Sequence, residues 1–577
     1  MQPIVLEDAF KTFTLDQDKI LPPEETVNRF REKLKAAGLD ILRETRRIDN
    51  GRIGIPVYIS RCGPEAQRII GTRKQMGKGA TPQQAEASAV MELAERFSFF
   101  SFVKNPVHFR RSPLAGIGDT AIPFEMIARS VHDDSDDLPV SRKIFESLSL
   151  NWTWAFNLTR GTHVQVPFDW FSAINEFNGP SAGNCKEEAI LQGICEIVER
   201  HVSSVISHER RAVPAIRPES ATDPMVVDML AKYRRSGISL FLSDFTLDMG
   251  IPSIGALAYD PATFPDRSEI VWTAGTTPSP EKALSRALTE VAQLAGDFNT
   301  SANYVASGLP KLRRIEEART VTDPGRRVDL HGLPDVSDVN IRVEIENCVQ
   351  ALAQRGFEVL LVETTHPRLQ IPAYYAIIPG AHFRERSRAT SVAMFAARHI
   401  TQTLPAAEAI AALEAIDAKL PGKYYLQFYL GLSRLNAGEA ESALPFFRRA
   451  LELNPDASES PSIYSYMGVA LKETGRFAEA LDWLNRGAAL DPERTDIHNL
   501  MGFCHFKRGE HEQAVAAFRR VIDLDPTSAI DYANLGVNLE ALGEPQKAVE
   551  CYRMALTLDP GIEFARSHLT RLSGASP

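Results

Sequence analysis

Two stretches of the chain place carboxylates on one face of an otherwise apolar helical pattern. The first comprises Ser88, Glu92, Glu95 and Arg96. At about 100° per residue these four side chains fall within a narrow arc, and the residues between them are Ala, Val, Met and Leu. Ionised carboxylates in apolar surroundings are costly unless they are paired, hydrogen-bonded or bound to a metal ion.

The second stretch begins at Ser181 and Asn184 and repeats this arrangement over a longer pattern. Its helical face carries Glu188, Gln192, Glu196, Glu199 and Arg200. Two carboxylates about 5 Å apart repel each other by roughly 3 kcal/mol at an effective dielectric constant of about 20. If the two helices meet, the Glu side chains outnumber the Arg side chains, and a divalent cation resolves that imbalance. Mg²⁺ is the hard cation that accompanies nucleotide phosphates, so the pattern favours a Mg²⁺-nucleotide site.

A plainer interpretation is open at this point. Glu and Arg four residues apart are common surface pairs on soluble helices, and either stretch alone is equally well explained in that way. Both stretches end in Glu-x-x-Glu-Arg, however, and this repetition favours a shared site.

The spacing resembles the ATP-binding signatures of the YcaO family. The family patterns are Ser-x3-Glu-x2-Glu-Arg, Ser-x6-Glu-x3-Gln and Glu-x3-Arg, and the chain matches all three in order. The run Gly77–Thr81 before the first helix and the segment Arg286–Glu290 also resemble conserved parts of the family. The resemblance covers roughly residues 1–400.

The resemblance implies binding of ATP with Mg²⁺ held by glutamates, and activation of a peptide backbone amide to give azolines, thioamides or amidines. The ATP-binding residues it implies are Ser88, Glu92, Arg96, Ser181, Asn184, Glu188, Gln192, Arg200 and Arg286. The metal ligands it implies are drawn from Glu92, Glu95, Glu188, Glu196 and Glu199. Lys19 and Thr26 resemble a Lys-x6-Ser/Thr arrangement at the nucleotide site of a stand-alone member. The alternative for that pair is a solvated Lys and a helix N-cap at Thr26.

The glycines from Gly71 to Gly79 superficially suggest a P-loop. The Walker pattern has four residues between its glycines and a Ser or Thr after the Lys. Here five residues separate Gly71 from Gly77, and Gly79 follows Lys78. Two interpretations are open: a structural turn, which we favour, or a backbone turn that approaches a phosphate where a helix begins near Thr81.

The segments that must position these residues alternate between helical and extended patterns. Helices are predicted at 82–101, 184–208, 281–296 and 342–355. Strands are predicted at Ile53–Ser60, Trp152–Thr159, Ile238–Ser243, Ser253–Tyr259, Glu358–Glu363 and Ala373–Ile378. The alternation predicts an α/β (α+β) domain over residues 1–400.

The rest of the chain is repetitive. Gly431, Gly468, Gly502 and Gly536 recur at intervals of 37, 34 and 34 residues, and Gly438, Gly475, Gly509 and Gly543 follow the same spacing. A period of about 34 residues is the tetratricopeptide signature of an all-α superhelix. We expect a helical linker over 401–422 and repeats over 423–577, in about four units with a capping helix at Ile562–Leu572.

Composition limits the kinds of partner. The net charge of −10 argues against general binding to nucleic acid or to an anionic membrane. No apolar run approaches 18 residues, so no transmembrane helix is expected, and the start lacks the pattern of a signal peptide. The six Cys residues are scattered without a Cys-x-x-Cys motif, which fits a reducing, cytoplasmic compartment.

Three functions remain open. The first is an ATP-dependent enzyme that activates a backbone amide of a peptide or protein substrate, in a modification such as thioamide or azoline formation. The second is an accessory ATPase or adaptor for a separate enzyme, such as a ribosomal-protein methylthiotransferase. The third is a repeat-based scaffold with a vestigial ATP site. The repeats are expected to bind a partner enzyme or to mediate self-association, such as a homodimer.

Overall fold

The structure is a computed structural model that describes residues 3–15, 18–300, 304, 308–383 and 390–574. The chain divides into two compact units. One comprises Met1–Ser135 and Glu146–Ser391, and the other Asp136–Phe145 and Val392–Pro577. The first unit mixes sheets and helices and the second is helical, which confirms the predicted fold class.

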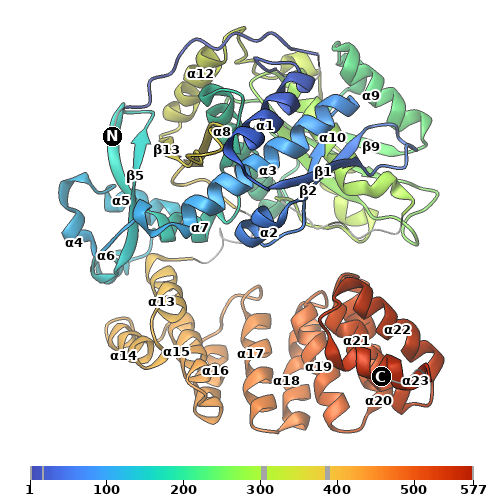
Figure 1. The fold of residues 1–577 in the computed structure, drawn as a ribbon. Helices are drawn as coiled ribbons and strands as arrows, with labels where there is room; N and C mark the ends of the chain where they lie inside the picture. Colours follow the sequence, from blue (N-terminus) through green and yellow to red (C-terminus); the bar gives the residue numbers. More distant parts are fainter. Residues whose placement is uncertain (1–2, 16–17, 301–303, 305–307, 384–389, 575–577) are drawn as a thin grey trace. The chain divides into compact units, whose positions relative to one another are not determined.

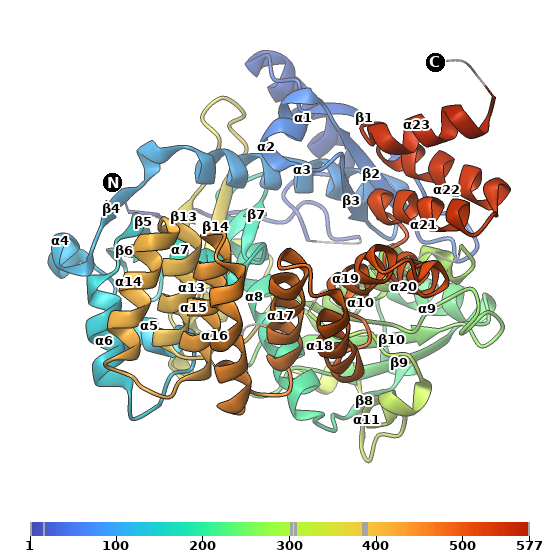
Figure 2. The same cartoon turned by 90° about the horizontal axis from the view of Figure 1, so that it is seen from below.

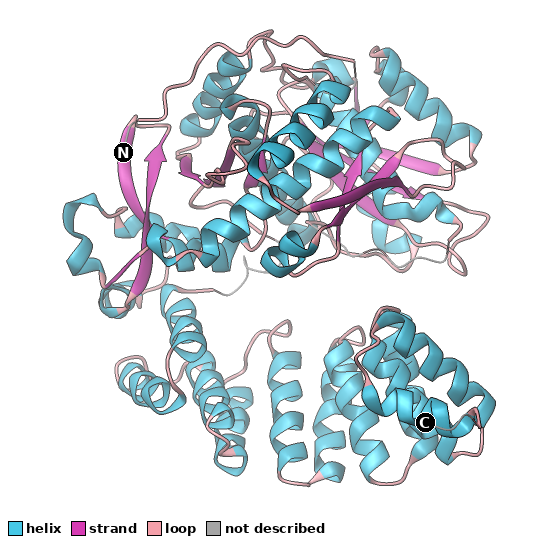
Figure 3. Ribbon diagram, in the orientation of Figure 1, coloured by secondary structure: helices cyan, strands magenta, loops and turns pink. Residues whose placement is uncertain are grey.

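The strands of the first unit form three sheets (Figure 3). A three-stranded antiparallel sheet holds β1 (Leu42–Arg47), β2 (Val57–Cys62) and β3 (Lys74–Lys78). A five-stranded sheet has the order β11 (Val271–Thr276), β10 (Ser253–Tyr259), β9 (Ser239–Asp244), β8 (Ala215–Ile216) and β12 (Arg327–Val328). A six-stranded sheet has the order β4 (Arg110–Ser112), β5 (Leu150–Asn157), β13 (Leu360–Glu363), β14 (Ala373–Ile377) and β7 (Pro180–Ala182), with β6 (Thr162–Pro167) paired to β5.

Three long helices each pack on a different sheet (Figure 1). α3 (Pro82–Lys104) packs on β2 and β3, α8 (Lys186–Glu209) on β7 and β14, and α10 (Pro280–Ala295) on β10 and β11. The other helices of this unit are α1 (Pro23–Ala37), α2 (Pro64–Ile70), α4 (Leu114–Ile117), α5 (Phe124–Ser130), α7 (Phe168–Asn175), α9 (Pro224–Arg235), α11 (Arg319–Thr322) and α12 (Ile341–Gln354). α6 (Leu138–Ser147) spans a boundary between the units.

Local sequence explains where the motif helices begin. The hydroxyl of Thr81 accepts a hydrogen bond from the Gln84 backbone N–H, and Pro82 follows at the first helical position of α3. At α8 the N-cap is Cys185, whose sulfur accepts from the Glu188 N–H at 3.5 Å. α3 thus begins ten residues before its first motif carboxylate, Glu92, and α8 begins two residues before Glu188.

The apolar face of α3 forms a core with α1. Val90, Leu93 and Phe97 pack with Val27 and Phe30, and all five side chains are almost fully buried. Full burial of such a side chain contributes about 1.5–3 kcal/mol, so this core fixes the helix and leaves its polar face free for a site.

The glycines before α3 serve close packing. A Cβ at Gly77 would lie 2.1 Å from the Ala89 nitrogen, and one at Gly79 would lie 2.6 Å from the Ala85 nitrogen. The strand and the helix approach each other so closely that no side chain fits between them. This geometry favours the structural-turn interpretation of the glycine run.

Most predicted elements of this unit are present within a few residues of their expected ends, with two differences. The strand predicted at Ile53–Ser60 lies at Val57–Cys62, because Ile53 belongs to the preceding loop and is buried there. Thr26 is not an N-cap: α1 begins at Pro23, and the Thr26 hydroxyl donates to the Pro22 carbonyl at 3.2 Å.

The second unit consists of helices that stack in chain order (Figures 1 and 2). They are α13 (Val392–Thr403), α14 (Ala406–Asp417), α15 (Tyr424–Asn436), α16 (Ala440–Glu452), α17 (Ser460–Glu473), α18 (Phe477–Leu490), α19 (Thr495–Lys507), α20 (His511–Leu524), α21 (Ala529–Ala541), α22 (Pro545–Leu558) and α23 (Glu563–Leu572). From α15 onward they pack as antiparallel pairs, as the repeat period predicts.

The two glycine series have different roles. Gly502 in α19 faces the ring of Phe518 in α20, where a Cβ would lie 2.8 Å from the ring, and Gly536 faces Tyr552 in the same way. Gly509, between α19 and α20, has a φ of +74° that favours glycine. One series allows the helices of a pair to approach, and the other turns the chain between them. Within the described residues, no helix is both long and apolar enough to span a membrane.

Candidate functional site

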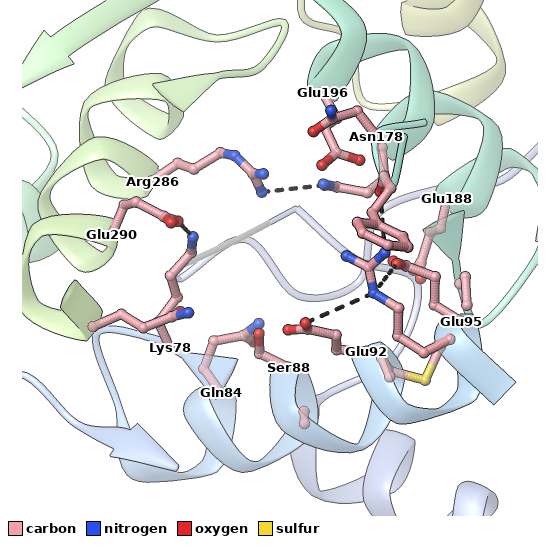
Figure 4. Close-up of a pocket in the computed structure, with 18 of the residues that line it drawn as sticks. Lys78, Gln84, Ser88, Glu92, Glu95, Asn178, Glu188, Glu196, Arg286 and Glu290 are labelled. Carbon is pink, nitrogen blue, oxygen red and sulfur yellow. Dashed lines mark hydrogen bonds and ion pairs between the residues drawn. The ribbon is translucent and has the colours of Figure 1, made fainter. Parts of the chain in front are cut away.

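A cavity of about 590 Å³ lies between the polar faces of α3, α8 and α10 in the first unit (Figure 4). It is also lined by the N-terminal segment, by Ile174 and by Glu176–Asn178. Twelve of the predicted site residues line it: Lys19, Thr26, Ser88, Glu92, Glu95, Arg96, Asn184, Glu188, Gln192, Glu196, Arg200 and Arg286. The carboxylates therefore do not form two unrelated surface pairs but gather around one cavity.

Two predicted residues do not line the cavity. Ser181 lies in β7, where its hydroxyl donates to the Tyr374 carbonyl at 3.4 Å. Glu199 lies on α8 with its side chain only 3% exposed, behind Arg286 and Arg200. Both are buried neighbours of the residues that reach the cavity. Ser181 and Asn184 also precede α8, so they extend the second motif without belonging to its helix.

On α3, one arginine faces two carboxylates. The Arg96 Nε lies 3.3 Å from Glu95 Oε1 and 4.0 Å from Glu92 Oε1. Burial raises the pKa of Glu92, and it raises the pKa of Glu95 well above its usual range, with Glu196 adding repulsion to both. Arg96 opposes these shifts without cancelling them, so this cluster still favours an added positive charge.

On α8, Glu199 aligns two arginines. Its carboxylate lies 3.0 Å from Arg286 Nε and 3.6 Å from Arg200 Nη1. Burial disfavours the charged form of Glu199, but Arg286 and Arg200 outweigh burial and lower its pKa. The Arg286 guanidinium also donates to the Gln192 side-chain oxygen at 3.4 Å.

Glu188 anchors the N-terminal segment. One of its oxygens accepts from the Ile20 backbone N–H at 2.7 Å. The other accepts from the backbone and side-chain nitrogens of Asn184 at 2.9 and 3.1 Å. These contacts hold the segment next to Lys19 against α8. Lys19 and Thr26 both line the cavity, and Thr26 is not the N-cap of α1.

Sequence reasoning missed six polar residues of the cavity wall: Lys78, Gln84, Glu176, Asn178, Glu290 and Gln293. Lys78 at the end of β3 forms an ion pair with Glu290 of α10. Burial, followed by the neighbouring Arg286 guanidinium, lowers the pKa of Lys78 to about 7. The signals were present in the Gly77–Thr81 run, from which no residue was assigned to the site, and in the Arg286–Glu290 segment, of which only Arg286 was assigned.

The donor set fits a cation that arrives with phosphate. Glu92, Glu95 and Glu196 face the same space from two helices (Figure 4). Within the described part of the chain, no three His, Cys, Asp or Glu side chains meet closely enough to hold a metal ion by themselves. Mg²⁺ in nucleotide sites typically takes one or two carboxylates and completes its shell with phosphate oxygens and water. Lys78, Arg96, Arg200 and Arg286 supply the matching positive charges for phosphate.

Comparison with known proteins gives the class. A family model described as YcaO cyclodehydratase, ATP- and Mg²⁺-binding, matches residues 76–382, which is more than half of the chain. The chain therefore belongs to the YcaO family, and the predicted ATP and Mg²⁺ agree with the family's description. Three tetratricopeptide-repeat models match residues 406–458, 434–504 and 493–560, which confirms the repeats.

Several relatives match the first part of the chain. An uncharacterized protein of Methanothermobacter thermautotrophicus is 30% identical over 381 residues, which are 62% of this chain and 93% of that protein. A protein from the tfuA 3′ region of Rhizobium leguminosarum bv. trifolii is 24% identical over 393 residues, 63% of this chain and 88% of that protein. The Escherichia coli ribosomal protein S12 methylthiotransferase accessory factor YcaO is 28% identical over 243 residues, 38% of this chain and 40% of that protein.

Two solved structures share the fold. A heterocyclase in complex with substrate and cofactor has a TM-score of 0.53 and 24% identity, and the match covers 66% of this chain and 55% of that chain. The chain thus spans about half of the heterocyclase's length. YcaO from Methanopyrus kandleri bound with AMPPCP and Mg²⁺ has a TM-score of 0.50 and 23% identity, covering 65% of this chain and 95% of that one.

Proposed function

We propose that this protein is an ATP- and Mg²⁺-dependent enzyme that activates a backbone amide of a peptide or protein by phosphorylating the amide oxygen. The observation that carries this proposal is the gathering of Glu92, Glu95 and Glu196 opposite Lys78 and Arg286 in one cavity. Membership of the YcaO family, whose model is described as a cyclodehydratase that binds ATP and Mg²⁺, supports the nucleotide, and a heterocyclase solved in complex with substrate and cofactor has the same fold.

The need for ATP follows from amide chemistry. Attack on a backbone amide carbonyl gives a tetrahedral adduct whose oxygen is a poor leaving group. Bound Mg²⁺-ATP would supply the γ-phosphoryl group for this oxygen and leave as ADP, so that the C–O bond could break with phosphate as the leaving group. The chain's task is to orient the reactants and to stabilise charge in a partly buried site, where electrostatic interactions are stronger than in water.

Roles for the residues follow from their places. One or two of Glu92, Glu95 and Glu196 are the proposed Mg²⁺ ligands, and Lys78, Arg96, Arg200 and Arg286 are the proposed phosphate contacts. Thr26, Gln84, Ser88, Asn184 and Gln192 offer uncharged donors and acceptors for the rest of the nucleotide, with Lys19 beside them. Glu188, Glu199 and Ser181 have supporting roles. Glu188, at the cavity wall, holds the Ile20 backbone, and Glu199, behind the wall, holds Arg286. Ser181 supports the β7 segment that precedes α8.

Isotope transfer tests the reaction. Mg²⁺-ATP binding is measured first by calorimetry with the purified full chain, and ATP turnover is then compared with and without peptides. A peptide that stimulates turnover is resynthesised with ¹⁸O in its backbone amides. The proposal expects ¹⁸O in the released phosphate, whereas label found only when the water is ¹⁸O would identify simple ATP hydrolysis and contradict it.

A second candidate is an accessory ATPase whose repeats dock a separate modification enzyme. The name of the E. coli relative, an accessory factor of a methylthiotransferase, and the repeats of this chain favour it. Under this candidate the chain alone hydrolyses ATP without transferring amide oxygen, and a partner protein changes the turnover rate. A scaffold with a vestigial site does not explain the convergence of the charged side chains on one cavity.

A further inference from the structure

The segment Phe177–Gly179, between α7 and β7, touches a different signature residue with each of its members. The Phe177 carbonyl accepts from Arg96 Nη1 at 3.0 Å. The Asn178 Oδ1 accepts from Arg200 Nε at 2.9 Å, and the Gly179 N–H donates to Glu196 Oε2 at 3.2 Å. One short segment thus connects α3 and α8 at the wall of the cavity.

The backbone around this segment is constrained. Glu176 has a φ of +53° and a ψ of −112°, an unfavourable conformation for a residue with a side chain. Gly179 has a φ of +96°, and a Cβ there would lie 2.5 Å from the Ala376 carbonyl oxygen. The Gly179 carbonyl accepts from the Ala376 N–H at 2.9 Å, which ties the segment to β14. The segment is therefore held from the sheet side, independently of its contacts with the signature residues.

The Asn178 amide is fixed in the orientation that Arg200 requires. Its Nδ2 donates to the Asn175 carbonyl at 2.8 Å, which leaves Oδ1 directed at Arg200 Nε. Glu196 and Glu199 lie 3.6 Å from the terminal nitrogens of Arg200. A guanidinium bonded through Nε presents its terminal nitrogens in a defined plane, and such a plane suits bidentate binding of phosphate.

We propose that Asn178 is a positioning residue of the nucleotide site, which acts through Arg200 and sets that guanidinium for a phosphate group of the bound nucleotide. This inference rests on the proposed function and deepens it. Asn178 does not itself carry out chemistry. Its contribution is to hold one arginine in place, so that binding does not have to order that side chain first.

The test compares ligands with and without phosphate in the full chain. In Asn178→Ala we expect Mg²⁺-ATP to bind about 10-fold more weakly, as for the loss of one hydrogen bond to a charged group, with adenosine affinity unchanged. Serine also suits a turn, but its side chain is too short to reach Arg200, so Asn178→Ser should weaken Mg²⁺-ATP binding as Asn178→Ala does and leave adenosine affinity unchanged. The control Asn347→Ala removes a similar side-chain bond, 3.1 Å to the Val336 carbonyl. Asn347 does not line the cavity, so this variant should leave both affinities unchanged.

A double-mutant cycle separates positioning from a general structural role. Arg200→Lys keeps the positive charge but removes the Nε–H donor, so adding Asn178→Ala to it should have little further effect. Equal weakening of ATP and adenosine, or full additivity with Arg200→Lys, would overturn the inference while leaving the proposed function intact. A wild-type chain without measurable Mg²⁺-ATP binding would overturn both.

Discussion

The Nε atom of Arg286 lies 3.0 Å from Oε2 of Glu199, and that carboxylate is almost completely shielded from solvent. Because Glu199 also faces Arg200 and does not line the cavity, it differs from the other motif glutamates. We predict that Glu199→Gln destabilises the protein without ligand by about 3–5 kcal/mol, as expected when one partner of a buried ion pair is removed. Urea unfolding followed by circular dichroism measures the change.

Glu95 serves as the matched contrast. Burial and the neighbouring carboxylates raise its pKa, so its charged form is disfavoured in the folded state. We predict that Glu95→Gln leaves stability without ligand unchanged or raises it, while it weakens Mg²⁺-ATP binding severely. If Glu95→Gln costs as much stability as Glu199→Gln, the α3 cluster is a structural ion-pair network and its assignment to the metal is wrong.

The same pair of variants predicts a pH dependence. A carboxyl whose pKa is raised by folding keeps its proton to a higher pH in the folded chain than in the unfolded chain. The free energy of unfolding of the wild type therefore decreases as the pH rises above the ordinary pKa of 4.5. The stability of Glu95→Gln relative to wild type should therefore increase as the pH rises through that range. Glu199 has a lowered pKa, so its contribution should be lost as the pH falls below 4.5. Unfolding curves at a series of pH values check both signs.

Lys78 gives a pH dependence of binding. Its pKa in the free protein is lowered to about 7, and a phosphate group nearby favours its charged form. We predict that Mg²⁺-ATP affinity decreases as the pH rises through 7, because binding must then protonate Lys78. Lys78→Met should bind more weakly and should lose this slope, as measured by calorimetry in buffers of different ionisation enthalpy. An unchanged slope in Lys78→Met would place the titrating group elsewhere.

Residue spacing was sufficient to predict the long elements and many of the side chains that line the cavity. The arc of Ser88, Glu92 and Arg96 is fixed by helical geometry alone, and the helix indeed presents these side chains to the cavity. Spacing could not predict Lys78 opposite Glu290, since that pair depends on how β3 and α10 pack in three dimensions. It also could not show that Glu199 turns away from the cavity, because one helical arc is wide enough to face both a cavity and a neighbouring helix. Asn178 was missed for a related reason, since its partner Arg200 is 22 residues away.

The last prediction concerns the division of the chain, for which we propose an ATP-binding domain over 1–400, a linker over 401–422 and repeats over 423–577. Every cavity-lining residue lies between Lys19 and Phe383, so a chain of residues 1–400 keeps the whole site. It keeps α13 only as far as Ile400 and loses α14 and α15, the helices on which α13 packs. We therefore expect a lower melting temperature but Mg²⁺-ATP affinity within about threefold of the full chain, a difference below about 1 kcal/mol.

The complementary fragment, residues 406–577, should fold alone, because each repeat packs mainly on its neighbours. Far-ultraviolet circular dichroism should show a helical spectrum and a cooperative melt. The molar mass of this fragment in solution, measured by light scattering and compared with that of residues 1–400, tells whether the repeats mediate self-association. If residues 1–400 are folded yet bind no nucleotide, while the full chain does, then the repeats contribute to the site and the proposed division is wrong.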